Sequence, residues 1–95
     1  HLQSKVIESR LIIAAEFYKK YRDNGGSKSL NEMINDFRIV ACASFHGLDI
    51  IISHDERSMF SKESIKSYGS VCDEYGLHVP EFIPYRNFKE MLKNG

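Results

Sequence analysis

The fold is predicted mainly from residues 35–55, which read NDFRIVACASFHGLDIIISHD. This stretch opens with Asn and Asp, which are good helix caps, and continues with small and apolar residues up to Gly47. Residues 36–46 are therefore predicted to form a helix that packs closely on a sheet. Leu48–Ser53 follows at once, and its three consecutive isoleucines are typical of a parallel strand buried on both faces.

Further helices and one further strand are expected on either side of this stretch. Ser4–Tyr21 has the spacing of an amphipathic helix, and Ser29 with Glu32 forms a capping box that predicts a helix or helical turn from Leu30. Downstream we expect a helix, an edge strand and a short helix, at residues 61–75, 78–84 and 87–93. This alternation predicts an α/β fold with a parallel sheet flanked by helices in three layers.

Length and composition indicate one small domain. The chain has 95 residues, with 13 basic and 13 acidic side chains. This balance counts mildly against a stand-alone nucleic-acid-binding module, but not against an enzyme whose site is acidic. No apolar run reaches the roughly 18 residues that cross a membrane, and no signal peptide is visible. Cys42 and Cys72 fit neither a zinc site nor a disulfide framework, so we predict a cytoplasmic protein without membrane contact.

The predicted sheet is too small to be stable by itself. Two parallel strands need further strands beside them, and the chain begins with His1 rather than Met. We therefore expect residues 1–95 to be a single but incomplete piece of a domain. Its missing strands would come from an earlier segment or from a second copy, and the uncovered apolar surface predicts a homo-oligomer.

Asp36 and Asp55 are the candidate chemical groups. The expected helix begins at Asp36, and Asp55 follows the expected strand. Because this helix and strand run in opposite directions over similar lengths, both aspartates are expected at the carboxyl edge of the sheet, where α/β proteins bind ligands. Two neighbouring carboxylates repel each other, and Mg²⁺ or Mn²⁺ would relieve that repulsion. Structural roles are the alternative, since Asp is a common helix cap and turn residue.

The same stretch resembles the PIN-domain family of nucleases. Residues 36–43 are similar to the family pattern of Asp, two residues and Ile-x-Ala-x-Ala. Residues 48–55 are similar to its next element, a buried strand that ends in Thr or Ser, one residue and Asp. The resemblance covers roughly Leu11–Pro84, which corresponds to the C-terminal half of a PIN domain.

The resemblance implies a role for each of three residues. Asp36 would be the third acid and Asp55 the fourth acid of a Mg²⁺ or Mn²⁺ site, and Ser53 would orient the acids by hydrogen bonding. The first acid of the family has no counterpart here, and Glu8 and Glu16 lie too close to Asp36 to replace the second. The piece itself is therefore expected to be inactive.

The function that the resemblance implies is that of a metal-dependent endoribonuclease, which hydrolyses phosphodiesters in RNA. Many relatives are toxins held by an antitoxin, so RNA and an antitoxin-like protein are the expected partners. A second hypothesis is a non-catalytic α/β interaction module that has lost the metal site. A receiver-like or nucleotide-binding domain is a weaker hypothesis, because no glycine-rich phosphate loop is present.

Three further residues flank the two acids. His54 could contact the substrate, and either Arg38 or Arg57 could bind a phosphate, because arginine presents a fork of donors suited to it. Solvated surface positions are the better interpretation for all three.

Overall fold

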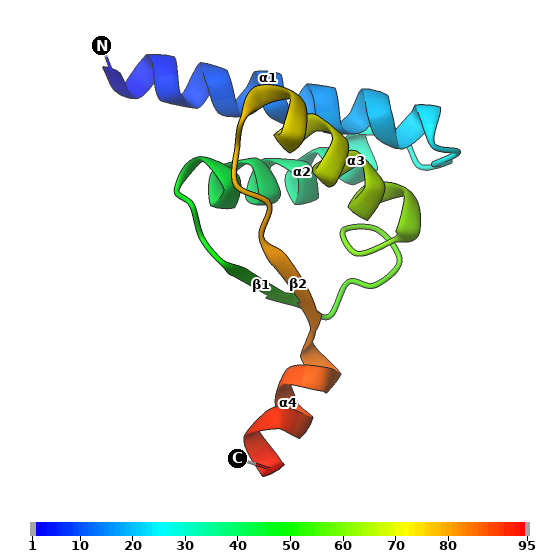
Figure 1. The fold of residues 1–95 in the computed structure, drawn as a ribbon. Coiled ribbons are helices and arrows are strands. Elements are labelled where there is room, and N and C mark those ends of the chain that lie inside the picture. Colours follow the sequence, from blue (N-terminus) through cyan, green and yellow to red (C-terminus); the bar gives the residue numbers. More distant parts are fainter. Residues whose placement is uncertain (1, 95) are drawn as a thin grey trace.

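The computed structural model describes residues 2–94, with the side chains of residues 9–93. Its elements are, in chain order, α1 Leu2–Asp23, α2 Leu30–Phe45, β1 Ile50–Ser53, α3 Lys62–Tyr75, β2 Glu81–Pro84 and α4 Tyr85–Asn94. The strands β1 and β2 pair in parallel, and α3 forms the crossover between them (Figure 1). The predicted mixed α/β class with a parallel sheet is confirmed.

The helices α1, α2 and α3 pack together on one side of the sheet. Helix α1 packs on both α2 and α3, and the two strands lie on the other side of α2 (Figure 1). Helix α4 extends away from the end of β2. Among the described residues α1, α2 and α3 thus lie on one face of the sheet, and the predicted arrangement of helices on both faces is not seen in this part of the chain.

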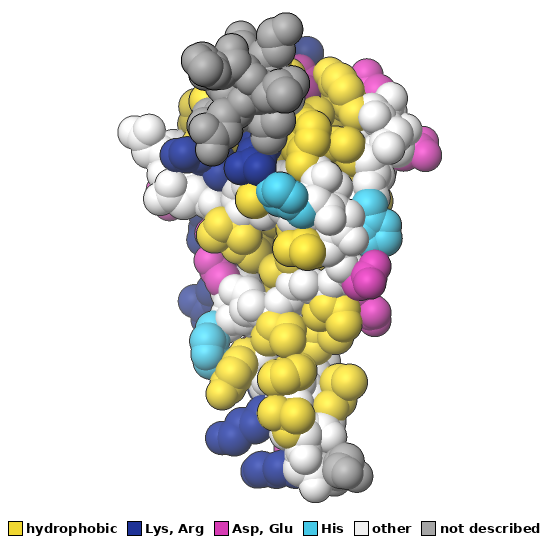
Figure 2. All heavy atoms as spheres, turned by 90° about the vertical axis from the view of Figure 1, so that its left-hand side faces the viewer, with side chains coloured by type: hydrophobic (Ala, Val, Ile, Leu, Met, Phe, Trp, Pro, Cys, Tyr) yellow, Lys and Arg dark blue, Asp and Glu magenta, His cyan; other side chains and the backbone are white. Residues whose placement is uncertain are grey.

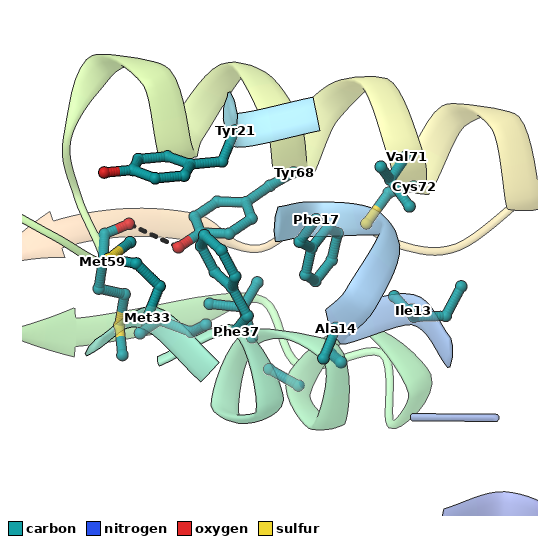
Figure 3. Close-up of a cluster of buried hydrophobic side chains, with 14 residues drawn as sticks. Ile13, Ala14, Phe17, Tyr21, Met33, Phe37, Met59, Tyr68, Val71 and Cys72 are labelled. Carbon is teal, nitrogen blue, oxygen red and sulfur yellow. Dashed lines mark hydrogen bonds between the residues drawn. The ribbon is translucent and has the colours of Figure 1, made fainter. Parts of the chain in front are cut away.

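An aromatic cluster holds the three helices together. The rings of Phe17 on α1, Phe37 on α2 and Tyr68 on α3 are fully buried, and Tyr68 lies edge-on to both phenylalanines, at centroid distances of 5.0 and 5.8 Å (Figure 3). Such edge-to-face contacts add to the free energy gained by burying each ring. The Tyr68 hydroxyl donates to the Met59 carbonyl at 2.7 Å, which fixes the loop before α3.

Helix α2 differs from its prediction in one respect. The capping box of Ser29 and Glu32 starts the helix at Leu30, and the helix then continues without a break. Met33 and Phe37 are both fully buried and lie four residues apart, on the same face of the helix. Their burial carries the helix past the second capping signal, so Asp36 lies inside α2 rather than at its start.

The strands are shorter than predicted, and β1 is not buried on both faces. Ile51 is 9% exposed and belongs to the core, whereas Ile50 and Ile52 are 50% and 39% exposed. Successive side chains of a strand point to opposite faces, so the helices cover only the face that carries Ile51. Strand β2 begins at Glu81, directly after Pro80, and the Glu81 amide donates to the Asp49 carbonyl at 2.7 Å.

The ends of α3 follow the sequence closely. Ser61 is the N-cap and its hydroxyl accepts a hydrogen bond from the Ser64 amide. Gly76 ends the helix with a φ of 68°, in the left-handed region that glycine adopts without steric cost. This helix returns the chain so that β2 lies beside β1. The last helix begins at Tyr85, directly after β2 and two residues earlier than predicted.

Candidate functional site

Asp36 and Asp55 meet just beyond the C-terminal end of β1. The hydroxyl of Ser58 lies between them, 2.8 Å from Oδ2 of Asp36 and hydrogen-bonded to Oδ2 of Asp55. Two carboxylates that contact one hydroxyl oxygen are close enough to share an ion, directly or through water. The structure thus brings together the two acids singled out in the sequence.

The direction of α2 explains this meeting. From Asp36 to Phe45, α2 spans roughly 15 Å at about 1.5 Å per residue. The chain then turns at Gly47, which has a φ of 64°, and returns along β1. Asp36 is inside the helix, but the part of α2 that follows it still matches the returning strand in length, so both acids reach the same end.

A tight turn after β1 presents the Asp55 carboxylate. The Asp55 amide donates to Oγ of Ser53 at 3.0 Å, and the Ser58 amide donates to Oδ1 of Asp55 at 3.0 Å. Ser53 therefore orients Asp55 by accepting a hydrogen bond from the Asp55 backbone amide. Within the part of the chain that the structure describes, the Ser53 hydroxyl makes no hydrogen bond to either carboxylate, so the direct orienting role implied by the resemblance is not seen.

Ser58 is the residue of this site that the sequence did not single out. It is 6% exposed, and its carbonyl accepts a hydrogen bond from the Ser64 hydroxyl at 2.6 Å, which anchors it to α3. Its contact with Asp36 joins residues far apart in the chain, which no local pattern reveals. The available signal was the Asp-x-x-Ser spacing from Asp55, because Asp side chains often accept from backbone amides shortly after them.

The two carboxyl groups have different acidities. Burial raises the pKa of Asp36, and the neighbouring charge of Asp55 raises it further, against a hydrogen bond from Ser58. Burial also acts to raise the pKa of Asp55, but the hydrogen bonds from the hydroxyl and amide of Ser58 outweigh it and leave that pKa below its usual range. Lys28 lowers the pKa of both groups by its positive charge.

The proton count around Ser58 has a chemical consequence. A hydroxyl has a single proton, so Ser58 can donate to only one of the two carboxylates at a time. The second contact is favourable only if the other carboxyl carries a proton or if a cation balances the extra negative charge. Asp36, with its raised pKa, is the carboxyl group of the pair that takes up a proton first as the pH falls.

Few possible metal ligands lie near Asp36 and Asp55. Among the described residues, no group of three or more His, Cys, Asp and Glu side chains is placed to hold a metal ion. The His54 ring lies 4.2 Å from the Tyr85 ring, centroid to centroid, and Arg38 and Arg57 are exposed. Asp36 and Asp55 would therefore supply two oxygen ligands, and water or a phosphate would have to supply the rest.

Comparison with known proteins leaves the family open. No family model matches the chain, and neither a curated protein nor a solved structure matches it significantly. None of the helices in the described residues is long and apolar enough to cross a membrane. Function has to be inferred from the contacts of Asp36, Asp55 and Ser58 and from the pattern of residues 36–55.

Proposed function

We propose that the chain is the C-terminal half of a PIN-like, metal-dependent endoribonuclease. One observation carries this proposal: Asp36 of α2 and Asp55 after β1 contact the same Ser58 hydroxyl. Two carboxylates so close together are costly unless a proton or a cation accompanies them. The pattern of residues 36–55, which resembles the PIN family at these two acids, favours the cation.

The chain's own residues would each have a part in the reaction. Asp36 and Asp55 would hold Mg²⁺ or Mn²⁺, since hard cations prefer carboxylate oxygens. Ser58 keeps both carboxylates in place, and its amide fixes Oδ1 of Asp55. A cation held there lowers the pKa of a bound water and polarises a phosphate, which is the chemistry that phosphodiester hydrolysis needs.

Two acids alone make a weak site. Divalent cations normally take six or more oxygen ligands, and each missing carboxylate removes charge that holds the ion. We therefore expect this piece to bind metal weakly and to cleave RNA only when further acids complete the site. RNA as substrate, an antitoxin-like protein as partner and a homo-oligomer are predictions that accompany this proposal.

A non-catalytic interaction module is the second candidate. It is favoured by the absence of a third metal-ligating side chain among the described residues. In that case the carboxyl pair takes up no cation and, through Ser58, only joins α2 to the turn after β1. The two candidates differ in whether the pair takes up a cation at neutral pH.

Calorimetric titration with Mn²⁺ separates the two candidates. We expect the wild-type chain to bind Mn²⁺ with weak affinity and Asp36→Asn to lose this binding. Asp49→Asn is the matched control, because Asp49 lies at the other end of β1 and its side chain is 88% exposed. In the complete domain, Asp36→Asn should also abolish RNA cleavage. Equal Mn²⁺ binding by the wild type and Asp36→Asn would refute the proposed metal site.

A further inference from the structure

Helix α3 holds the turn that carries Ser58. The hydroxyl of Ser64 donates to the Ser58 carbonyl at 2.6 Å, and the hydroxyl of Tyr68 donates to the Met59 carbonyl at 2.7 Å (Figure 3). Ser64 and Tyr68 are four residues apart in α3 and therefore lie on the same face of the helix. Two consecutive carbonyls of the turn are thus held by two side chains from one helix face.

The two donors are polar groups inside a molecule whose surface carries many apolar ones. On the side drawn in Figure 2, hydrophobic side chains form an exposed band that runs down to α4. Ser64 and Tyr68, in contrast, are fully buried. A buried polar group is tolerated only when it is hydrogen-bonded, so these two hydroxyls depend on the carbonyls of the turn as partners.

The carbonyls depend equally on the hydroxyls. Ser58 and Met59 are buried, so water cannot easily replace a donor that is removed. Burial raises the pKa of the Tyr68 phenol, and the negative charges of Asp36 and Asp55 raise it further. The phenol therefore keeps its proton and remains a donor. Loss of either hydroxyl should loosen the turn.

The same turn places the two carboxylates. The Ser58 amide donates to Oδ1 of Asp55 at 3.0 Å, and the Ser58 hydroxyl contacts both Asp55 and Asp36. The carbonyl that Ser64 holds belongs to this same residue. Side chains of a working site have to be held within about 0.5 Å of their productive positions. The hydrogen bonds from α3 therefore bear on the geometry of the carboxyl pair.

We propose that Ser64 and Tyr68 are positioning residues, which hold the turn so that Ser58 bridges the two carboxylates. Among the described residues, neither hydroxyl donates to a carboxylate, so both act through the backbone of the turn. Their part in metal binding rests on the proposed function. In the proposed metal site they would raise the affinity for the cation without being ligands, as residues behind metal ligands do.

Two variants remove one hydroxyl each and leave the packing in place. Ser64→Ala keeps the helix, because alanine has the highest helix propensity. Tyr68→Phe keeps the ring in the aromatic cluster. Ser67→Ala is the matched control, because Ser67 is also fully buried on α3 but its hydroxyl donates to the Ser64 carbonyl at 2.6 Å, within the helix.

Hydrogen exchange of the Ser58 amide, followed by NMR without metal, reports on the turn. This amide donates to Asp55, so it exchanges faster when the contact is lost. Rates are taken relative to the amides of α2, which corrects for an overall loss of stability. We expect the relative rate to be about tenfold higher in Ser64→Ala than in Ser67→Ala, and higher in Tyr68→Phe as well.

Mn²⁺ binding by the same samples tests the part of the two hydroxyls in the proposed metal site. Mn²⁺ is paramagnetic and broadens the signals of nearby amides, so a titration measures even weak binding. We expect Ser64→Ala to bind Mn²⁺ about tenfold more weakly than the wild type, which is the size of effect known for residues that orient metal ligands. Ser67→Ala should bind like the wild type.

The two measurements separate failure of the inference from failure of the proposed function. A variant whose relative exchange rate equals that of Ser67→Ala excludes its residue from the role, and the inference is wrong if both variants do so. No Mn²⁺ binding by the wild type, with faster exchange in the variants, would refute the metal site and leave the positioning of the carboxyl pair supported. Faster exchange with unchanged Mn²⁺ affinity would overturn the role of the two hydroxyls in metal binding.

Discussion

The two sides of β1 are built very differently. On one side, Ile51 joins a core in which Phe17, Phe37 and Tyr68 lock three helices together. On the other side, Ile50 and the outward backbone groups of β1 face an apolar groove. The three helices thus pack around a filled core, whereas the two-stranded sheet leaves one edge and one face of β1 uncovered by the described residues. The carboxyl pair lies just beyond the C-terminal end of β1.

The largest expected difference in stability is between alanine substitutions at two neighbouring residues of β1. Ile51→Ala should lower the free energy of unfolding by about 2–4 kcal/mol, because it leaves a cavity in a filled core. Ile50→Ala removes the same atoms from an exposed position and should change it by less than about 1 kcal/mol. Urea denaturation of both variants measures the difference. Equal losses would mean that the outer face of β1 is already covered in solution, by self-association for example.

An intermediate effect is expected at Ser58. Ser58→Ala removes the hydroxyl that contacts both carboxylates and should lower the free energy of unfolding by about 1–3 kcal/mol at neutral pH. Ser70→Ala, at an exposed position on α3, is the control and should have little effect.

The pH dependence of the Ser58→Ala effect follows from Asp55. The pKa of Asp55 is lowered in the folded state, so its contribution to stability is present above the unfolded pKa of about 3.9 and is lost as the pH falls. The loss caused by Ser58→Ala should therefore shrink in acid. A loss that is the same at every pH would show that Ser58 matters for the loop alone and not for the carboxylates.

Local sequence chemistry predicted the ends of the helices well. Ser29 with Glu32, Ser61 and Gly76 act at the predicted ends because a cap depends on residues within one turn. The capping signal at Asn35–Asp36 failed for the opposite reason. Burial of side chains on one face of α2 stabilises a continuous helix. This stabilisation is larger than the local preference for a new helix start at the capping signal.

The segments that pack against a helix or strand could not be predicted from the residues of that helix or strand alone. Three consecutive isoleucines indicate a strand that can be buried on both faces, but whether both faces are covered depends on other segments. The meeting of Asp36 and Asp55 was predictable, because it follows from the matched lengths of a helix and a returning strand. The part played by Ser58 was not, since it depends on a contact between residues 22 positions apart.

The smallest expected effect distinguishes a proton from a cation at the carboxyl pair. The pKa of Asp36 is raised in the folded state, so its ionisation destabilises the fold at neutral pH, and this penalty disappears below the unfolded pKa of about 3.9. Asn lacks the charge, can still accept the hydrogen bond from Ser58 and has a similar helix propensity. With a chelator present, Asp36→Asn should therefore be slightly more stable than the wild type at pH 7 and equally stable in acid.

Saturating Mn²⁺ should reverse the order of stability at pH 7. A ligand that binds only the folded state raises the free energy of unfolding, so the wild type should gain stability and Asp36→Asn should not. Thermal unfolding at both pH values, with chelator or with Mn²⁺, measures the four conditions on the same pair of proteins. If Mn²⁺ stabilised neither protein, the pair would bind no cation and the interaction module would be favoured. If Asp36→Asn were the less stable protein in chelator at pH 7, the charge of Lys28 would outweigh the repulsion between the two acids, and the premise that the pair needs a proton or a cation would be wrong.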